Sequence, residues 1–192
     1  MRVAGLALAG VLLMACGCGS STGPAAVQLH LNTAVQELHQ GQVVNGVPCL
    51  STDIPEHHLH VHLAVYYEGV RVKVPAGIGV GRPWRFDNSG FLANGSCFAW
   101  LHTHDTTGVI HIATPALHVF DLQQIFQLWG QALTPSGAFN YSGAMTVLVD
   151  GRRDTDDPRV LALTQYENIV LELGKPPAVA PASIYDFSGM SK

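Results

Sequence analysis

The feature that most constrains the fold is a strict alternation of histidine with aliphatic residues. From position 57 to position 63 the chain reads His-His-Leu-His-Val-His-Leu. Side chains along a β-strand point to opposite faces with a period of two, and a buried aliphatic face fixes the register strongly. The pattern therefore predicts a strand over His57–Tyr67 that presents the imidazoles of His58, His60 and His62 on one face.

A second segment, Trp100–Ile112, places three more histidines and an aspartate between two apolar runs. Aromatic and β-branched residues flank Asp-Thr-Thr-Gly, which predicts a β-hairpin with a four-residue loop. In that register His104 faces Val109 and His102 faces His111. The side chains of His102, His104 and His111 would then emerge on one face of the hairpin.

The composition favours short strands and turns over helices. Among 192 residues there are 20 glycines and 11 prolines, charged residues make up only 12%, and an apolar fraction of 47% is enough for a core. Glu68-Gly69 and Asp150-Gly151 predict two tight hairpins. Further strands are expected at Val70–Val74, Ala144–Val149, Val160–Leu163 and Ile169–Leu173. The sequence predicts an all-β fold, a sandwich or barrel of short antiparallel strands with one short α-helix.

The helix is expected within Phe120–Gly130. Its apolar residues Leu122, Ile125, Phe126 and Trp129 recur at helical spacing, with Asp121 placed to cap the start and Gly130 to end the last turn. A less regular apolar spacing over Val27–Gln42 predicts a second, amphipathic helix.

The N-terminus reads as a targeting segment. Arg2 precedes an apolar run that is too short to span a bilayer, and the Leu13-Met14-Ala15-Cys16 sequence resembles the lipobox of bacterial lipoproteins. The resemblance implies a signal peptide over residues 1–15, a lipid on Cys16, a flexible tether over residues 16–27 and one β-rich domain over residues 28–192. The alternatives are modification of Cys18 or an ordinary secretory signal. All of them imply an exported protein, anchored to the cell envelope through its N-terminal lipid where Cys16 or Cys18 is modified.

Two cysteines remain in the domain, Cys49 and Cys97, and in an exported protein such a pair is most simply a disulfide. The formal net charge of −4 excludes the basic footprint of a nucleic-acid-binding protein.

Six histidines at alternating strand positions indicate a metal site. Buried neutral imidazoles each need a hydrogen-bond partner and charged ones repel, and a divalent metal relieves both problems. Residues two apart on a strand are separated by about 6.6–6.8 Å at Cα, so one ion cannot easily take His58 and His62 together. The expected first shell is His60 with His62 or His58, joined by His102 and by His104 or His111. The remaining imidazoles would serve a second ion or the outer shell.

The donor set favours Cu(II) or Zn(II), as one ion or two. The domain has only Met145 and Met190 as thioether ligands, and Cys97 is expected to point away from the imidazoles, which argues against Cu(I) and blue-copper sites. Four other histidines lack the alternating context and are not expected to be ligands: His30, His39, His57 and His118.

The run Cys97–Ile112, with the alternating strand before it and the helix after it, resembles a widespread family of uncharacterised bacterial exported proteins. The resemblance covers Val47–Phe187 and implies an exported location with these histidines as the defining site.

The Trp-Leu-His-Thr-His sequence at 100–104 is similar to a segment of multicopper oxidases. This similarity implies copper binding by His102 and His104, with His60 and His62 as a second pair, although the chain lacks the His-Cys-His motif of those enzymes. A His-x-His strand with a third histidine on a neighbouring strand also resembles zinc carbonic anhydrases, where an open position holds an activated water.

Three functions remain open from the sequence. The first is an envelope metal-binding protein that sequesters, delivers or uses copper or zinc, with no protein partner identified. The second is a metal-dependent enzyme in which three histidines activate water or O₂, with Asp105 as a base or ligand-orienting group; its alternative role is an Asx-turn within its own loop. The third is a sensor or binding module without a metal, whose histidine face responds to protonation.

Overall fold

The computed structural model describes residues 31–51, 56–181 and 185–190. The signal peptide, the lipid-bearing cysteine and the tether that the sequence predicts lie outside the described residues, as does His30. No helix among the described residues is long and apolar enough to cross a membrane.

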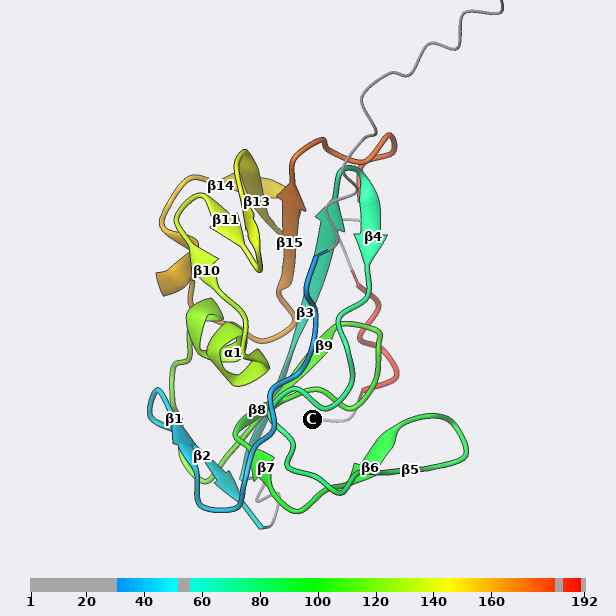
Figure 1. Cartoon of the computed structure of the whole chain (residues 1–192), viewed down its shortest axis with the longest axis vertical. Helices are drawn as coiled ribbons and strands as arrows, with labels where there is room; N and C mark the ends of the chain where they lie inside the picture. The colour runs from blue at the N-terminus through cyan, green and yellow to red at the C-terminus, as the bar shows by residue number, and fades with distance from the viewer. Residues whose placement is uncertain (1–30, 52–55, 182–184, 191–192) are drawn as a thin grey trace, which may run out of the picture. The chain divides into compact units, whose positions relative to one another are not determined.

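The alternating segment forms β3 (His57–Tyr67), the central strand of a seven-stranded sheet. Its first half pairs with β9 (Val109–Thr114), and its second half pairs with both β4 (Val70–Val72) and β15 (Asn168–Leu173). The strand order is β14-β13-β15-β3-β9-β8, with β4 beside β3 (Figure 1). The predicted all-β class with one short helix is confirmed.

The remaining strands are short. The rest of the large sheet consists of β8 (Leu101–His102), β13 (Met145–Val149) and β14 (Arg152–Asp154). Two three-stranded sheets contain β1 (Val43–Val44), β2 (Val47–Leu50) and β7 (Phe98–Ala99), and β10 (Leu133–Thr134), β11 (Gly137–Ala138) and β12 (Tyr141–Ser142). A two-stranded sheet pairs β5 (Arg85–Phe86) with β6 (Leu92–Asn94).

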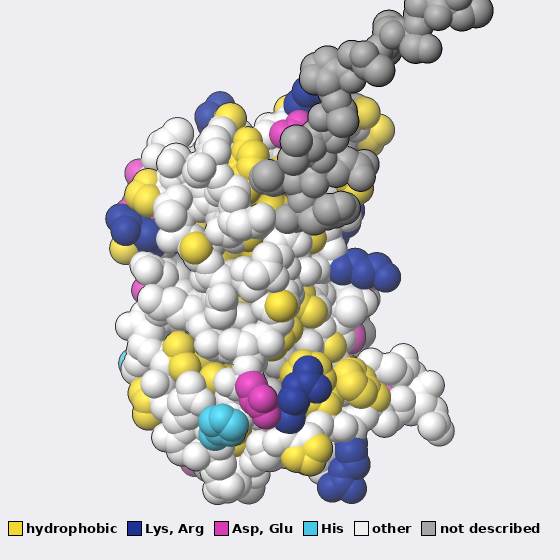
Figure 2. All heavy atoms as spheres, in the orientation of Figure 1, with side chains coloured by type: hydrophobic (Ala, Val, Ile, Leu, Met, Phe, Trp, Pro, Cys, Tyr) yellow, Lys and Arg dark blue, Asp and Glu magenta, His cyan; other side chains and the backbone are white. Residues whose placement is uncertain are grey.

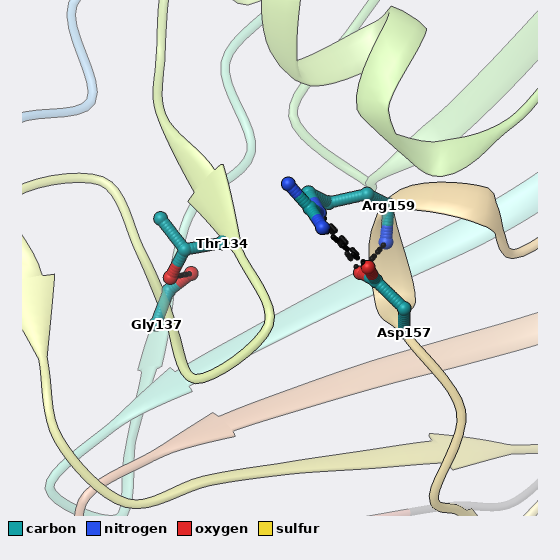
Figure 3. Close-up of polar contacts among 4 residues, drawn as sticks. All are labelled: Thr134, Gly137, Asp157 and Arg159. Carbon is teal, nitrogen blue, oxygen red and sulfur yellow. Dashed lines mark hydrogen bonds and ion pairs between the residues drawn. The ribbon is translucent and has the colours of Figure 1, made fainter.

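Two strand expectations differ from the structure. The pairing of β15 with β3 is parallel, because the chain crosses over through the helix and the β10–β14 segment before it returns. The strand predicted over Val160–Leu163 is instead a 3₁₀ turn, η1 (Pro158–Val160), followed by a single bridge from Ala162 to Asp121. Asp157 caps this turn: its carboxylate accepts a hydrogen bond from the Arg159 amide and forms an ion pair with the Arg159 guanidinium at 2.6 Å (Figure 3). In the β10–β11 turn, the Thr134 hydroxyl donates a hydrogen bond to the Gly137 carbonyl.

The core lies on the aliphatic face of the sheet. Val61, Leu63 and Val65 of β3 are fully buried and belong to the same cluster as the helix α1 (Leu122–Trp129). Five of the eight residues of α1 are buried, including Phe126 and Trp129. The opposite face of β3 is therefore the one that carries histidine.

The amphipathic helix predicted over Val27–Gln42 is wrong for its described part, since residues 31–42 form no helix. This segment instead binds the C-terminal end of α1. The Gln36 amide donates to the Trp129 carbonyl at 3.0 Å, the Gln36 side chain donates to the Leu128 carbonyl, and the Trp129 indole donates to the Thr33 carbonyl. The last carbonyls of a helix lack hydrogen-bond partners within the helix. The hydrogen bonds that residues 31–42 supply to them favour a non-helical conformation over the helix that the weak apolar periodicity of this segment predicts.

The hairpin and disulfide predictions are confirmed. Glu68-Gly69 and Asp150-Gly151 both have positive φ at the two turn positions, as a type I′ turn requires. Cys49 and Cys97 are joined by a disulfide that ties β2 to the end of the loop before β7.

Replacing Asp121 with alanine is expected to destabilise the protein by about 1 kcal/mol. Asp121 accepts from the Gln124 amide at 2.9 Å, and the Gln124 side chain accepts from the Asp121 amide at 3.0 Å, so the substitution breaks a reciprocal capping box. Urea unfolding measures the loss. Asp121→Asn is the control, because asparagine caps almost as well as aspartate; equal losses in the two variants would contradict the capping role.

Candidate metal centre

The imidazoles gather on three adjacent strands. His60 of β3 lies opposite His111 of β9, and His111 lies opposite His102 of β8, which forms one row across the sheet. The predicted pairing of His102 with His111 is confirmed. His58 and His104 flank this row, so that five imidazoles occupy one patch.

Three of these side chains, His58, His60 and His111, are positioned to hold a metal ion. Their ligand nitrogens all lie within 4.8 Å of one another. His58 Nε2 is 3.1 Å from His111 Nδ1, and the Nδ1 atom of His60 is buried without a hydrogen-bond partner in the described part of the chain. Two nitrogens bound to one ion at about 2.0–2.1 Å stand about 2.9 Å apart at a right angle and about 3.3 Å apart in a tetrahedron. The trio thus needs only small side-chain rotations to close on an ion.

His102 and His104 form a second pair with the geometry of metal ligands. Their Nδ1 atoms contact the carbonyl oxygens of Ala99 at 2.8 Å and Leu92 at 2.6 Å. A carbonyl only accepts, so both Nδ1 atoms carry hydrogen, and in the neutral form of each ring Nε2 then offers a lone pair. These Nε2 atoms lie 3.0 Å apart. A ligand histidine commonly donates its second N–H to a backbone carbonyl in the same way.

Burial keeps three imidazoles of the patch neutral. Burial, followed by the charges of neighbouring imidazoles, lowers the pKa of His60 to about 4. Burial also lowers the pKa of the fully buried His102 to about 3, and the pKa of His111 lies far below its usual range for the same reason. Neutral imidazoles are the form that binds metals, so these three side chains can bind a cation at neutral pH.

Aromatic rings cover one side of the patch. Phe91 stacks on His104 with ring centres 4.2 Å apart and planes 10° apart, and Phe98 meets His102 edge-on at 5.3 Å. His58 and His111 are half-buried, whereas His60, His102 and His104 are buried. The patch is therefore shielded around His102 and His104 and more open to water at His58 and His111. On the face drawn in Figure 2, little histidine reaches the surface.

The chain from Cys97 to His104 forms no continuous strand. Trp100 separates β7 from β8, and its ring lies 6.1 Å from the ring of His118, outside the patch, and 6.3 Å from that of Phe120. His104 leaves the sheet after β8, because its carbonyl accepts from the Leu92 amide at 2.7 Å. The expected pairing of His104 with Val109 is wrong, since β8 ends at His102 and its ladder with β9 does not extend to His104. The His104 ring nevertheless lies 4.6 Å from the His111 ring.

His62 and Asp105 have other surroundings. The His62 ring stacks on Tyr185 at 4.4 Å, and its Nε2 lies 3.2 Å from the Thr107 carbonyl. Burial, ahead of the Arg71 charge, lowers the pKa of His62 to about 4. Asp105 accepts from the amide and hydroxyl of Thr107 at 2.9 and 2.5 Å. This bonding confirms the Asx-turn as the role of Asp105 in the loop.

No family model, curated protein or solved structure matches the chain.

Several residues that contact the histidines of the site were not predicted from the sequence. The alternation rule identifies histidines but not the groups that orient them: the carbonyls of Leu92 and Ala99, the rings of Phe91 and Phe98, and Gln165, whose side chain accepts from the His60 amide at 2.7 Å. Leu92 and Phe91 lie in the segment 87–96, which is rich in asparagine, glycine and serine. Nothing in its sequence indicates that it contacts histidine.

Proposed function

We propose that this chain is a metal-binding protein of the cell envelope that holds copper or zinc in its histidine patch. The ligands would come from five residues: His58, His60, His102, His104 and His111. The observation that supports this most is the convergence of ligand nitrogens from His58, His60 and His111 within 4.8 Å, with the buried Nδ1 of His60 lacking any other described partner. A buried polar atom without a partner is costly, and a bound ion would remove that cost.

The choice of metal rests on the donor set. All five side chains are imidazoles, which suit Cu(II) and Zn(II). Nitrogen separations of 3.0 and 3.1 Å within the two pairs lie between the values for tetragonal and tetrahedral coordination. Five imidazoles exceed the four ligands of a usual zinc site, so the patch has donors for a second ion or for an outer shell.

The envelope location is proposed on separate grounds. The disulfide between Cys49 and Cys97 is typical of an oxidising compartment. The Leu13-Met14-Ala15-Cys16 sequence, with its resemblance to a lipobox, supports export and lipidation at Cys16.

Metal content of the purified protein tests the proposal. The protein is expected to carry one or two copper or zinc ions, and the double variant His60→Ala/His111→Ala is expected to lose them. The loss of affinity should reach at least about 100-fold, because outer-shell partners alone are worth about 10–100-fold. Elemental analysis gives the content, and competition with a chelator gives the affinity.

The matched control is His39→Ala/His118→Ala, which removes two exposed histidines outside the patch. The control should retain the wild-type metal content. A wild-type protein without metal that binds added copper or zinc no more tightly than the control would overturn the proposal. Loss of only one of two ions in a His102→Ala variant would show that the two halves of the patch hold separate ions.

A metal-dependent enzyme is the second candidate, and the exposure of the trio favours it. His58 and His111 are half-buried, so a three-histidine ion there could keep a position for water. Replacement of the native ion by Co(II) tests this candidate. A visible spectrum that changes with pH as a bound water ionises would support it, whereas a spectrum independent of pH would support a closed storage or transport site.

A further inference from the structure

Beyond the patch, the histidine-bearing face of β3 continues into a cavity of about 420 Å³. His62 and Tyr66 line it from β3, and they share strand parity with His58 and His60. Arg71, which pairs with Tyr66 across the β3–β4 hairpin, lines it together with Lys73. Thr107 and Tyr185 also line the cavity.

The charge of this cavity is not balanced. Two cationic side chains line it, and no aspartate or glutamate is among its described lining residues. Among the described residues, the hydrogen-bond contacts of Arg71 Nη2 are both neutral: His62 Nε2 at 3.3 Å and the Thr107 carbonyl at 3.4 Å. Neither Arg71 nor Lys73 forms an ion pair with a described residue. The cavity beside β14 is different, because Asp150 and Asp154 accompany Arg152 and Arg153 there.

The guanidinium of Arg71 has N–H donors that form no hydrogen bond with a described residue. Its hydrogen bonds to described residues use Nη2 alone, so Nη1 and Nε face no described acceptor. A guanidinium presents its N–H groups as a fork that matches a carboxylate or phosphate group. Lys73, two residues further along the chain, adds a second positive charge on the same cavity.

The walls and the size indicate an organic ligand. The Arg71 guanidinium lies over the Tyr66 ring at 5.6 Å, and the Tyr185 ring stacks on His62 at 4.4 Å, so flat aromatic surfaces border the cationic groups. A volume of about 420 Å³ falls within the range of small-molecule sites and is larger than one inorganic anion requires. We propose that this cavity binds a small organic anion that carries a carboxylate or phosphate group, through Arg71 and Lys73.

This site does not depend on the metal. Its lining residues include none of the five histidines of the patch. His62 follows His60 by two positions on the same strand face, about 6.6–6.8 Å away at Cα, so a bound anion would lie next to the ligand shell of an ion.

Calorimetric titration at low ionic strength tests the proposal, with benzoate and phenyl phosphate as the two organic probes. Inorganic phosphate and the neutral analogue benzamide complete the set. We expect saturable binding of at least one organic probe, and none of benzamide. The double variant Arg71→Gln/Lys73→Gln should weaken the binding by about tenfold or more, because it removes charge-assisted hydrogen bonds.

The matched control is Arg152→Gln/Arg153→Gln, which changes the net charge by the same amount at the cavity that contains acidic residues. The control should retain wild-type affinity for the probe, and both double variants should retain wild-type metal content. No saturable binding of either organic probe would overturn the proposal. Equal weakening in both variants, or inorganic phosphate binding as tightly as phenyl phosphate, would overturn it as well.

Discussion

Acidification of the metal-free protein from pH 6.5 to pH 4.5 is expected to remove about 2.3 kcal/mol of its unfolding free energy through His102 alone. The folded-state pKa of His102 is depressed to about 3, whereas the unfolded value is 6.5, so the unfolded chain binds more protons throughout this interval. The stabilisation is fully present above pH 6.5 and is lost as the pH falls. His60, with a pKa lowered to about 4, adds a loss of the same sign that levels off below that pH.

Urea unfolding of the chelator-treated protein at several pH values measures this slope. His102→Gln should flatten it, because glutamine does not titrate, while His118→Gln, at an exposed position outside the patch, should leave it unchanged. Metal should oppose the loss at mildly acidic pH, since an ion that binds only the folded state stabilises it until protons displace the ion. A wild-type slope equal to that of His102→Gln would contradict the burial of neutral imidazoles.

Replacing Gly79 with alanine is expected to cost about 4 kcal/mol, the sum of about 1–3 kcal/mol for a left-handed non-glycine residue and about 1–3 kcal/mol for overpacking. Gly79 has φ +73°, and a Cβ there would lie 2.1 Å from the Leu101 carbonyl oxygen and 3.1 Å from His102 Cβ. Its own carbonyl accepts from the Ala99 amide at 2.7 Å, which holds the chain against the end of β7, two residues before β8 begins. The substitution should therefore also displace His102 and weaken metal binding.

Gly41→Ala is the matched control. Gly41 has nearly the same backbone conformation, φ +79°, but a Cβ there would meet no atom within 4 Å. Only the left-handed backbone penalty of about 1–3 kcal/mol should remain, with metal affinity unchanged. Equal unfolding midpoints for the two variants would show that the contact with Leu101 gives way at little cost.

The parts of the fold that were predicted correctly are those whose signals are local. The alternation in β3, the type I′ turns at Glu68-Gly69 and Asp150-Gly151, and the capped stripe of α1 each follow from a few neighbouring residues. A strand with one aliphatic face has a single workable register, and this is why the shared face of His58, His60 and His62 and the pairing of His102 with His111 could be anticipated.

The parts that differed depend on contacts between distant segments. Residues 31–42 form hydrogen bonds with the C-terminal end of α1 instead of forming a helix. Strand β15 pairs with β3 in parallel after a long crossover connection. His104 turns toward Leu92, a partner in a segment whose own sequence suggests only a loop. His62 has the same parity as His60 but lies beside Tyr185, more than a hundred residues later. Strand parity gives the face on which a side chain lies, and tertiary packing decides which side chains meet.

One neighbour of β3 is synthesised late, and this order would determine when an ion can bind. On one edge of His60, the amide and the carbonyl bond to Gln165 and Tyr166, which the ribosome adds about a hundred residues after His60 itself. Until that late segment arrives, the strand that carries His58 and His60 lacks one neighbour. Under the proposed function, loading of the ion would then follow synthesis of the segment that contains Gln165 and Tyr166. For a chain that crosses a membrane unfolded, the ion would come from the compartment of arrival, so that the supply of metal there, and not in the cytoplasm, would govern which ion the protein holds.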